Sequence, residues 1–166
     1  ASIAETVDRL RATFDSGRTR EIEWRRRQLR GLIDLVEQNE QRLIDAMVAD
    51  LGKPRFEAWL TDLLTTRDEA KFALDHLSRW VAPTRYPVPM MAKPGKAWTE
   101  PQPVGVVTVI APWNYPVQLL LAPLVGVLAA GNCAVLKPSE LVPETSRTIA
   151  ELVPHHLDPE AVAVVE

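Results

Sequence analysis

The stretch Val104-Gly105-Val106-Val107-Thr108-Val109-Ile110-Ala111 decides the fold, because it is a short apolar run, rich in β-branched residues, without alternation of polar and apolar side chains. This pattern is typical of a strand that is buried on both faces of a parallel sheet. The segment Cys133-Ala134-Val135-Leu136-Lys137 has the same character and is closed by Pro138. A further run, Ala161-Val162-Ala163-Val164-Val165, predicts the start of a third strand.

Helical segments separate these strands. Residues 116–130 are apolar on nearly all sides, which predicts a deeply packed helix, and Gly131 is suited to end it. A second helix is predicted near residues 143–153, before the third strand. The alternation of strand and helix predicts an α/β fold with a doubly wound parallel sheet, of which residues 104–166 form the first part.

Residues 1–82 have a different composition. Residues 1–81 hold 14 basic and 15 acidic residues, 29 of the 41 charged residues, whereas 13 of the 14 prolines lie from Pro83 onward. A segment rich in charge and poor in proline favours helices. We therefore predict that residues 1–82 form a helical layer that packs on the sheet.

Local signals predict the ends and faces of these helices. Ser2 and Glu5 have the spacing of a capping box, Asn39 is suited to cap a following helix, and Gly52 is suited to end it. A third helix is expected to begin near Pro54. Apolar residues at helical period predict its buried seam, which comprises Phe56, Leu60, Leu63, Ala70, Leu74, Leu77 and Val81. The run Arg25-Arg26-Arg27 alternates with acidic neighbours and is interpreted as a solvated helix face.

The segment 83–103 is interrupted by six prolines, which exclude a helix and a central strand: Pro83, Pro87, Pro89, Pro94, Pro101 and Pro103. An extended ribbon or edge hairpin, near residues 96–102, fits this composition.

Charge and hydropathy exclude several classes of function. The formal net charge of −3 gives no electrostatic basis for binding nucleic acid or an anionic membrane. The absence of any stretch near eighteen consecutive apolar residues predicts no membrane span. The single cysteine, Cys133, cannot form an internal disulfide, so a cytoplasmic location is expected. No metal site is expected, because the pair His155-His156 has no further ligands at a suitable spacing.

Two polar clusters follow the first two predicted strands. Trp113-Asn114 comes after the first strand, and Lys137-Pro138-Ser139-Glu140 comes at the end of the second. Because ligands of open α/β sheets bind outside the carboxyl ends of the strands, we expect both clusters to face one crevice.

The residue types in these clusters leave two interpretations open. The Asn114 amide can donate to a developing oxyanion, or it can cap the helix that follows. Glu140 can accept from ribose hydroxyls while Lys137 donates to hydroxyls or phosphate, or both can be solvated loop charges. Ser139 is interpreted as a turn or cap residue. The usual glycine-rich fingerprints for dinucleotides and phosphates are absent from the sequence.

Four motifs in order resemble those of aldehyde dehydrogenases: Pro103-Val104-Gly105-Val106-Val107, Pro112-Trp113-Asn114-Tyr115-Pro116, Ala129-Ala130-Gly131-Asn132 and Leu136-Lys137-Pro138-Ser139-Glu140. Their form is similar to the class 3 and coniferyl aldehyde dehydrogenase branch. Lys53-Pro54-Arg55-Phe56-Glu57-Ala58 also resembles that branch, so the resemblance covers most of the chain.

The resemblance implies a function for each cluster. Asn114 matches the asparagine that donates its amide to the oxyanion of the thiohemiacetal. Lys137 and Glu140 match residues that hold the adenosine ribose of NAD or NADP, and Trp113 matches a residue that lines the cofactor cleft. The implied reaction oxidises a small-molecule aldehyde to a carboxylic acid through a cysteine thioester. The early helices and the segment 83–103 match parts that flank the cofactor domain and support oligomers, so a homodimer is expected.

The chain resembles only the N-terminal portion of this family. The nucleophilic cysteine and the general-base glutamate are expected beyond Glu166, so the 166-residue chain alone is expected to be inactive. Cys133 is not the nucleophile on this view, because a thiol inside an apolar strand packs as a small hydrophobe. The alternatives are a noncatalytic cofactor-binding or oligomerisation module, and a related acyl-phosphate or CoA-dependent reductase.

Overall fold

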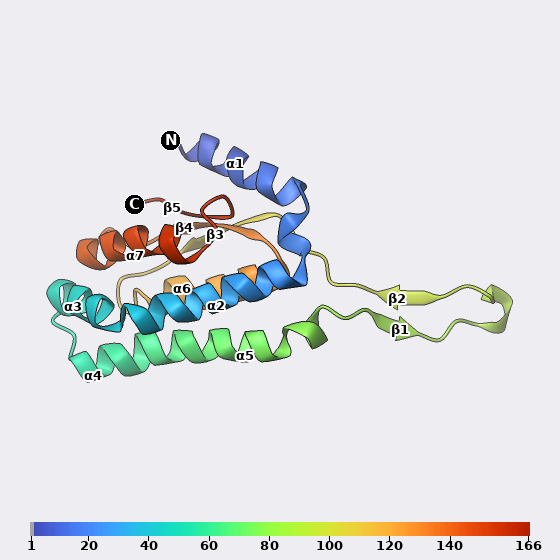
Figure 1. The fold of residues 1–166 in the computed structure, drawn as a ribbon, viewed down its shortest axis with the longest axis horizontal. Coiled ribbons are helices and arrows are strands. Elements are labelled where there is room, and N and C mark those ends of the chain that lie inside the picture. Colours follow the sequence, from blue (N-terminus) through green and yellow to red (C-terminus); the bar gives the residue numbers. More distant parts are fainter. Residues whose placement is uncertain (1) are drawn as a thin grey trace.

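The computed structural model describes residues 2–166 as a helical layer, a protruding hairpin and a parallel sheet with its crossover helices (Figure 1). The α-helices are α1 Ile3–Asp15, α2 Ile22–Gln38, α3 Glu40–Leu51, α4 Arg55–Glu57, α5 Thr65–Trp80, α6 Gln118–Ala130 and α7 Pro143–His156. The strands are β1 Thr84–Tyr86, β2 Ala97–Thr99, β3 Val106–Ile110, β4 Cys133–Lys137 and β5 Val162–Val164. None of the helices in this part of the chain is both long enough and apolar enough to span a bilayer.

The central sheet has three strands in the order β3-β4-β5, all parallel. The three predicted strands are thus confirmed, and β4 has the predicted bounds. Its first four residues are buried, as continuous apolar sequence predicts. Burial on both faces is wrong for β3, because Thr108 and Ile110, which point to one face, are exposed, whereas Val109 on the other face is buried.

Helices cover both faces of the sheet. Helix α1 packs on β3 and β4 from one side, and α6 packs on the same strands from the other (Figure 1). Helix α2 lies against both α6 and α7, α5 lies against α2 and α6, and α3 lies against α7. The predicted helical layer therefore supports the two crossover helices that follow β3 and β4.

The predicted capping box at the start of α1 is confirmed. The Glu5 backbone amide donates to the Ser2 hydroxyl at 3.2 Å, and the Ser2 amide donates to the Glu5 carboxylate at 2.7 Å. Gly52 ends α3 with a φ of +61°, also as predicted. Asn39 occupies the predicted N-cap position of α3, but its side chain makes no capping hydrogen bond. Its amide instead donates to the Leu35 carbonyl at 3.0 Å and lies 3.1 Å from the ring of His156.

The third helix contains a π-helical segment, Ala58–Leu64, between α4 and α5. A π-helix bonds residue i to i+5, so each of its turns takes up extra residues and rotates the following side chains. The predicted seam is therefore only partly correct. Leu63, Ala70 and Leu77 are buried, but Phe56 is 70% and Leu60 41% exposed. Asp62, which is not a residue of the predicted seam, is fully buried.

Arg25 also departs from the sequence interpretation, because it is only 7% exposed rather than part of a solvated face. Its guanidinium donates to the carbonyls of Thr19 and Ala129, both at 3.3 Å. Ala129 is in the last turn of α6, where carbonyls lack helical partners and the helix dipole attracts a cation. Desolvation by burial lowers the pKa of Arg25.

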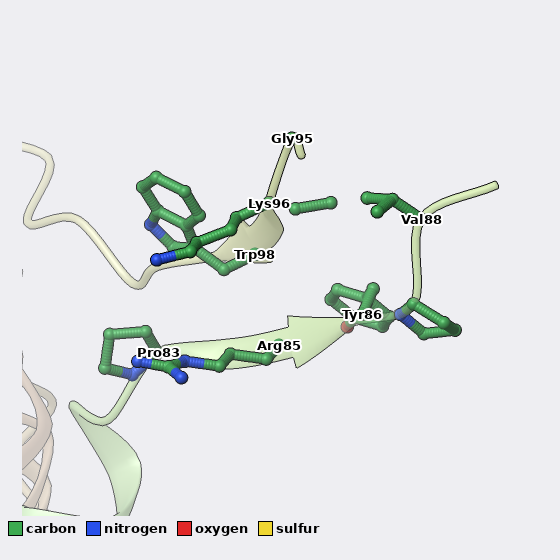
Figure 2. A pocket seen from close by; sticks show the side chains of 9 residues that line it. Pro83, Arg85, Tyr86, Val88, Gly95, Lys96 and Trp98 are labelled. Atoms are coloured by element: carbon green, nitrogen blue, oxygen red, sulfur yellow. The ribbon is translucent and has the colours of Figure 1, made fainter. Parts of the chain in front are cut away.

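The predicted hairpin is present and projects away from the rest of the molecule (Figure 1). Strands β1 and β2 pair antiparallel, with Arg85 opposite Trp98. A cavity of about 640 Å³ lies between the two arms, and Trp98, Arg85 and Tyr86 are among the side chains that line it (Figure 2). This cavity is on the hairpin and not at the sheet edge.

Candidate functional site at the carboxyl edge of the sheet

The two polar clusters leave neighbouring strands at the same edge. Ile110 at the end of β3 pairs with Lys137 at the end of β4. The backbone amide of Ala111 also donates to the Lys137 carbonyl at 3.1 Å, so the pairing continues up to the turn that carries Trp113 and Asn114. The register therefore places the start of that turn beside Lys137.

Asn114 is exposed, and within residues 2–166 its side chain caps nothing. The first turn of α6 begins at the carbonyl of Tyr115, which accepts from the Leu119 amide at 2.9 Å. The free amides of that turn belong to Val117 and Gln118, and both donate to the Asp62 carboxylate, at 3.1 and 3.2 Å. Asp62 thus performs the capping role that the sequence left open for Asn114.

The Lys137–Glu140 loop presents a carboxylate to solvent. The Lys137 ammonium donates to the Pro138 carbonyl at 2.7 Å and lies 3.4 Å from the Glu140 carboxylate, whose side chain is 81% exposed. The backbone amide of Glu140 and then the Lys137 ammonium lower the pKa of Glu140. The carboxylate is therefore ionised at neutral pH and is free to accept hydrogen bonds.

The other motif residues have structural roles. Ser139 is buried and its hydroxyl accepts from the Leu141 amide at 3.3 Å, which confirms the turn interpretation. Asn132 is buried at the amino end of the sheet, where its side-chain oxygen accepts from the amides of Val104 and Gly105 at 2.7 and 2.9 Å. Through Asn132, the Ala129–Asn132 motif therefore fixes the chain that leads into β3, at the amino edge of the sheet and away from the two polar clusters.

Cys133 is fully buried at the start of β4. Burial, together with the nearby Asp158 carboxylate, raises the pKa of its thiol to about 11. The thiolate is the nucleophilic form of cysteine, so burial and the raised pKa both disfavour nucleophilic attack by Cys133. The structure thus confirms that Cys133 packs as a small hydrophobe inside an apolar strand.

Sequence reasoning missed two charged residues that lie beneath the Asn114 turn, Lys53 and Asp62. Lys53 is 7% exposed and its ammonium is 2.7 Å from the Asp62 carboxylate. The only signal in the sequence was the Lys53–Ala58 motif. It indicated a family resemblance but not the contact between Lys53 and Asp62. A second cavity, of about 790 Å³, opens beside the same turn, and Tyr115, Gln118 and Thr61 are among its lining residues.

Comparison with known proteins agrees with the motifs. The whole chain, residues 1–166, matches the profile of the aldehyde dehydrogenase family. It is 42% identical over 163 residues to human aldehyde dehydrogenase family 3 member B1, covering 98% of this chain and 35% of that protein. It is 41% identical to mouse family 3 member B2, covering 96% of this chain and 33% of that protein. The chain thus spans about a third of the length of these relatives.

Solved structures show the same relationship. The substrate-bound state of Staphylococcus aureus AldH superimposes with a TM-score of 0.96 and 34% identity, covering 100% of this chain and 36% of that one. The profile match, the relatives and the superposition all extend over nearly the entire chain, and they confirm the resemblance read from the four motifs. The chain therefore belongs to the aldehyde dehydrogenase family.

Proposed function

We propose that the full-length protein in which this segment occurs oxidises a small-molecule aldehyde to a carboxylic acid, with NAD or NADP as the hydride acceptor. One observation carries the proposal. β3 and β4 end side by side, so that Asn114 and the Lys137–Glu140 loop follow adjacent strands, and the Asn114 side chain is exposed and caps no helix in the described chain. Family membership supports the reaction class.

The residues of this edge fit the ribose end of a dinucleotide. The exposed, ionised Glu140 carboxylate can accept two hydrogen bonds from vicinal hydroxyls, and the adjacent Lys137 ammonium can donate one. Trp113 is 51% exposed in the neighbouring turn and offers a flat apolar surface to the cleft. We assign cofactor binding to these residues. The dinucleotide, when bound, supplies the hydride acceptor.

Asn114 is assigned the role of oxyanion donor. When a thiolate attacks the aldehyde carbon, the carbonyl oxygen gains negative charge, and a preorganised amide N–H stabilises that charge more in the transition state than in the ground state. The thiolate is assigned to a cysteine outside residues 1–166, because Cys133 is buried and protonated. We assign the aldehyde to the cavity that is lined by Tyr115 and Gln118, the first of which follows Asn114 directly in the chain.

The proposal is tested by mixing the full-length protein with aldehydes and either NAD or NADP and following formation of the reduced cofactor. Aldehyde-dependent reduction is expected for the full-length protein and none for a polypeptide of residues 1–166. Turnover by residues 1–166 alone, or reduction of the cofactor independent of added aldehyde, would contradict the proposal. Retention of cofactor binding without turnover in the full-length protein would favour a noncatalytic module.

Substitution of Glu140 with glutamine separates cofactor binding from chemistry. Glutamine keeps the size of the side chain but removes the charge, and hydrogen bonds to charged groups are stronger than neutral ones. We expect the Kd for NAD to rise by about tenfold and kcat at saturating cofactor to change little. Isothermal titration measures the Kd. The variant Glu144→Gln, at a half-exposed ion pair with Arg147 on α7, is the control and should leave the Kd unchanged.

We also propose that the β1–β2 hairpin contacts a second copy of the chain in a homodimer. The hairpin exposes Tyr86, Met90, Met91 and Trp98, of which Met91 is 100% exposed. Apolar side chains gathered on a projecting ribbon are typical of a contact surface. Replacing Trp98 with lysine is expected to shift the full-length protein from dimer toward monomer in light scattering, and an unchanged mass would argue against this role.

A further inference from the structure

Lys53 and Asp62 form a buried ion pair that the proposed chemistry does not use directly. The ammonium and the carboxylate are 2.7 Å apart, and the two side chains are 6% and 0% exposed. Removing two charges from water carries a large desolvation cost, which is offset only when each group has further partners. The partners of this pair therefore indicate what the arrangement positions.

One carboxylate oxygen of Asp62 holds the start of α6. It accepts from the amides of Val117 and Gln118 at 3.1 and 3.2 Å, while the other oxygen accepts from Lys53 and, at 3.2 Å, from the Thr61 hydroxyl. Pro116 has no amide hydrogen, so these two amides are the free donors of this turn. Asp62 thereby fixes the chain three residues after Asn114.

Lys53 holds the same turn through the peptide of Asn114. Its ammonium is 3.3 Å from the backbone carbonyl of Asn114 and lies over the Tyr115 ring, 4.1 Å from the centroid. The Asn114 carbonyl belongs to the peptide plane that joins Asn114 to Tyr115. A hydrogen bond to this oxygen restricts rotation of the backbone on the C-terminal side of Asn114, while the Asn114 side chain remains exposed.

We propose that Lys53 and Asp62 are positioning residues that fix the orientation of Asn114, an inference that rests on the proposed role of Asn114 as oxyanion donor. An oxyanion donor must be held close to its productive geometry, because a small misplacement costs much of the rate. Asp62 anchors the helix that follows Asn114, and Lys53 anchors the Asn114 peptide itself. The pair links the helical layer to the edge of the sheet and explains why both charges are buried.

The test uses the full-length protein with the paired substitution Lys53→Met/Asp62→Asn. This variant has no charge at either position, and the amide oxygen introduced at position 62 can still accept from the α6 amides, but the ammonium that contacts Asn114 is gone. We expect the single-turnover rate of reduced-cofactor formation, normalised to cofactor-binding sites, to fall by about tenfold or more, with the Kd for NAD unchanged within about twofold. Asp62→Asn alone, which retains Lys53, is a second variant and is expected to give a smaller loss.

The control is Asp158→Asn. Like Asp62, Asp158 is paired with a cationic side chain, that of Arg18, and accepts a hydrogen bond from a backbone amide, that of Glu160 at 3.1 Å. Unlike Asp62, it precedes β5 and so lies near the amino edge of the sheet. This variant should lower the thermal midpoint without lowering the normalised rate. If Lys53 and Asp62 had a purely structural role, their variants would likewise show a lower thermal midpoint and an unchanged normalised rate.

A double-mutant cycle with Asn114→Ala shows whether the pair acts through Asn114. In the Asn114→Ala background, the paired substitution is expected to cause no further loss of rate, because the group it positions is gone. If the losses of rate from the paired substitution and from Asn114→Ala were additive, or if the paired variant had a normal rate, the positioning role would be overturned. The proposed oxyanion role of Asn114 would be unaffected by either result. An unchanged rate in Asn114→Ala itself would overturn the proposed oxyanion role together with this inference.

Discussion

Replacing Asn114 with alanine in the full-length protein is expected to lower kcat for aldehyde oxidation by about 10²–10³-fold, the usual cost of removing one oxyanion donor. The loss is expected in kcat and in kcat/KM alike, because the amide is needed only when charge develops on the oxygen. Steady-state assays with saturating NAD measure both constants.

The structure predicts that this loss does not come from unfolding. The Asn114 side chain is exposed and caps no helix, whereas Asp62 holds the start of α6, so the thermal midpoint of Asn114→Ala should equal that of the wild type. Asn114→Asp keeps the shape of the side chain, removes the N–H donors and adds a negative charge, so it should lose at least as much activity. A decrease below about threefold in either variant would contradict an oxyanion donor, because it is far below the usual cost.

Gly131→Ala is expected to destabilise the fold by about 2–4 kcal/mol, from left-handed backbone strain and overpacking. Gly131 has a φ of +86°, and a Cβ at this position would lie 2.7 Å from Nε of Arg25. The guanidinium cannot easily move, because it is buried and donates to the Thr19 and Ala129 carbonyls.

Gly52→Ala is the matched control for this effect. Gly52 also ends a helix with a positive φ, +61°, but a Cβ there would meet nothing within 4 Å. This variant should therefore cost only the backbone strain, about 1 kcal/mol. Denaturant unfolding measures the loss of unfolding free energy in each variant. The difference between the two losses gives the cost of the contact between the added Cβ and Arg25. Equal losses in the two variants would contradict the packing of Arg25 against Gly131.

Features that depend on neighbouring residues were predictable from the sequence. The bounds of β4 are correct because its apolar run is flanked by Asn132 and Pro138, and the capping box and the helix end at Gly131 are correct because they involve residues within one turn. The family resemblance is confirmed for a related reason, since four motifs in a fixed order are specific to one fold.

Features that depend on distant residues were not predictable. Asp62 accepts from amides 55 and 56 residues later, and Arg25 reaches a carbonyl 104 residues later, so helical periodicity contains no information on either contact. The π-helical segment Ala58–Leu64 adds to this, because it rotates the helix and turns Asp62 inward while Leu60 faces out. Periodicity at 3.6 residues assumes an unbroken α-helix.

A crystal structure of the full-length protein with NAD or NADP bound tests the function most directly. We expect the Glu140 carboxylate within hydrogen-bonding distance of the ribose hydroxyls, the Asn114 amide facing the sulfur of a cysteine outside residues 1–166, and Lys53 still bonded to the Asn114 carbonyl. A dinucleotide bound away from the carboxyl ends of β3 and β4, or an Asn114 amide directed away from that sulfur, would contradict it.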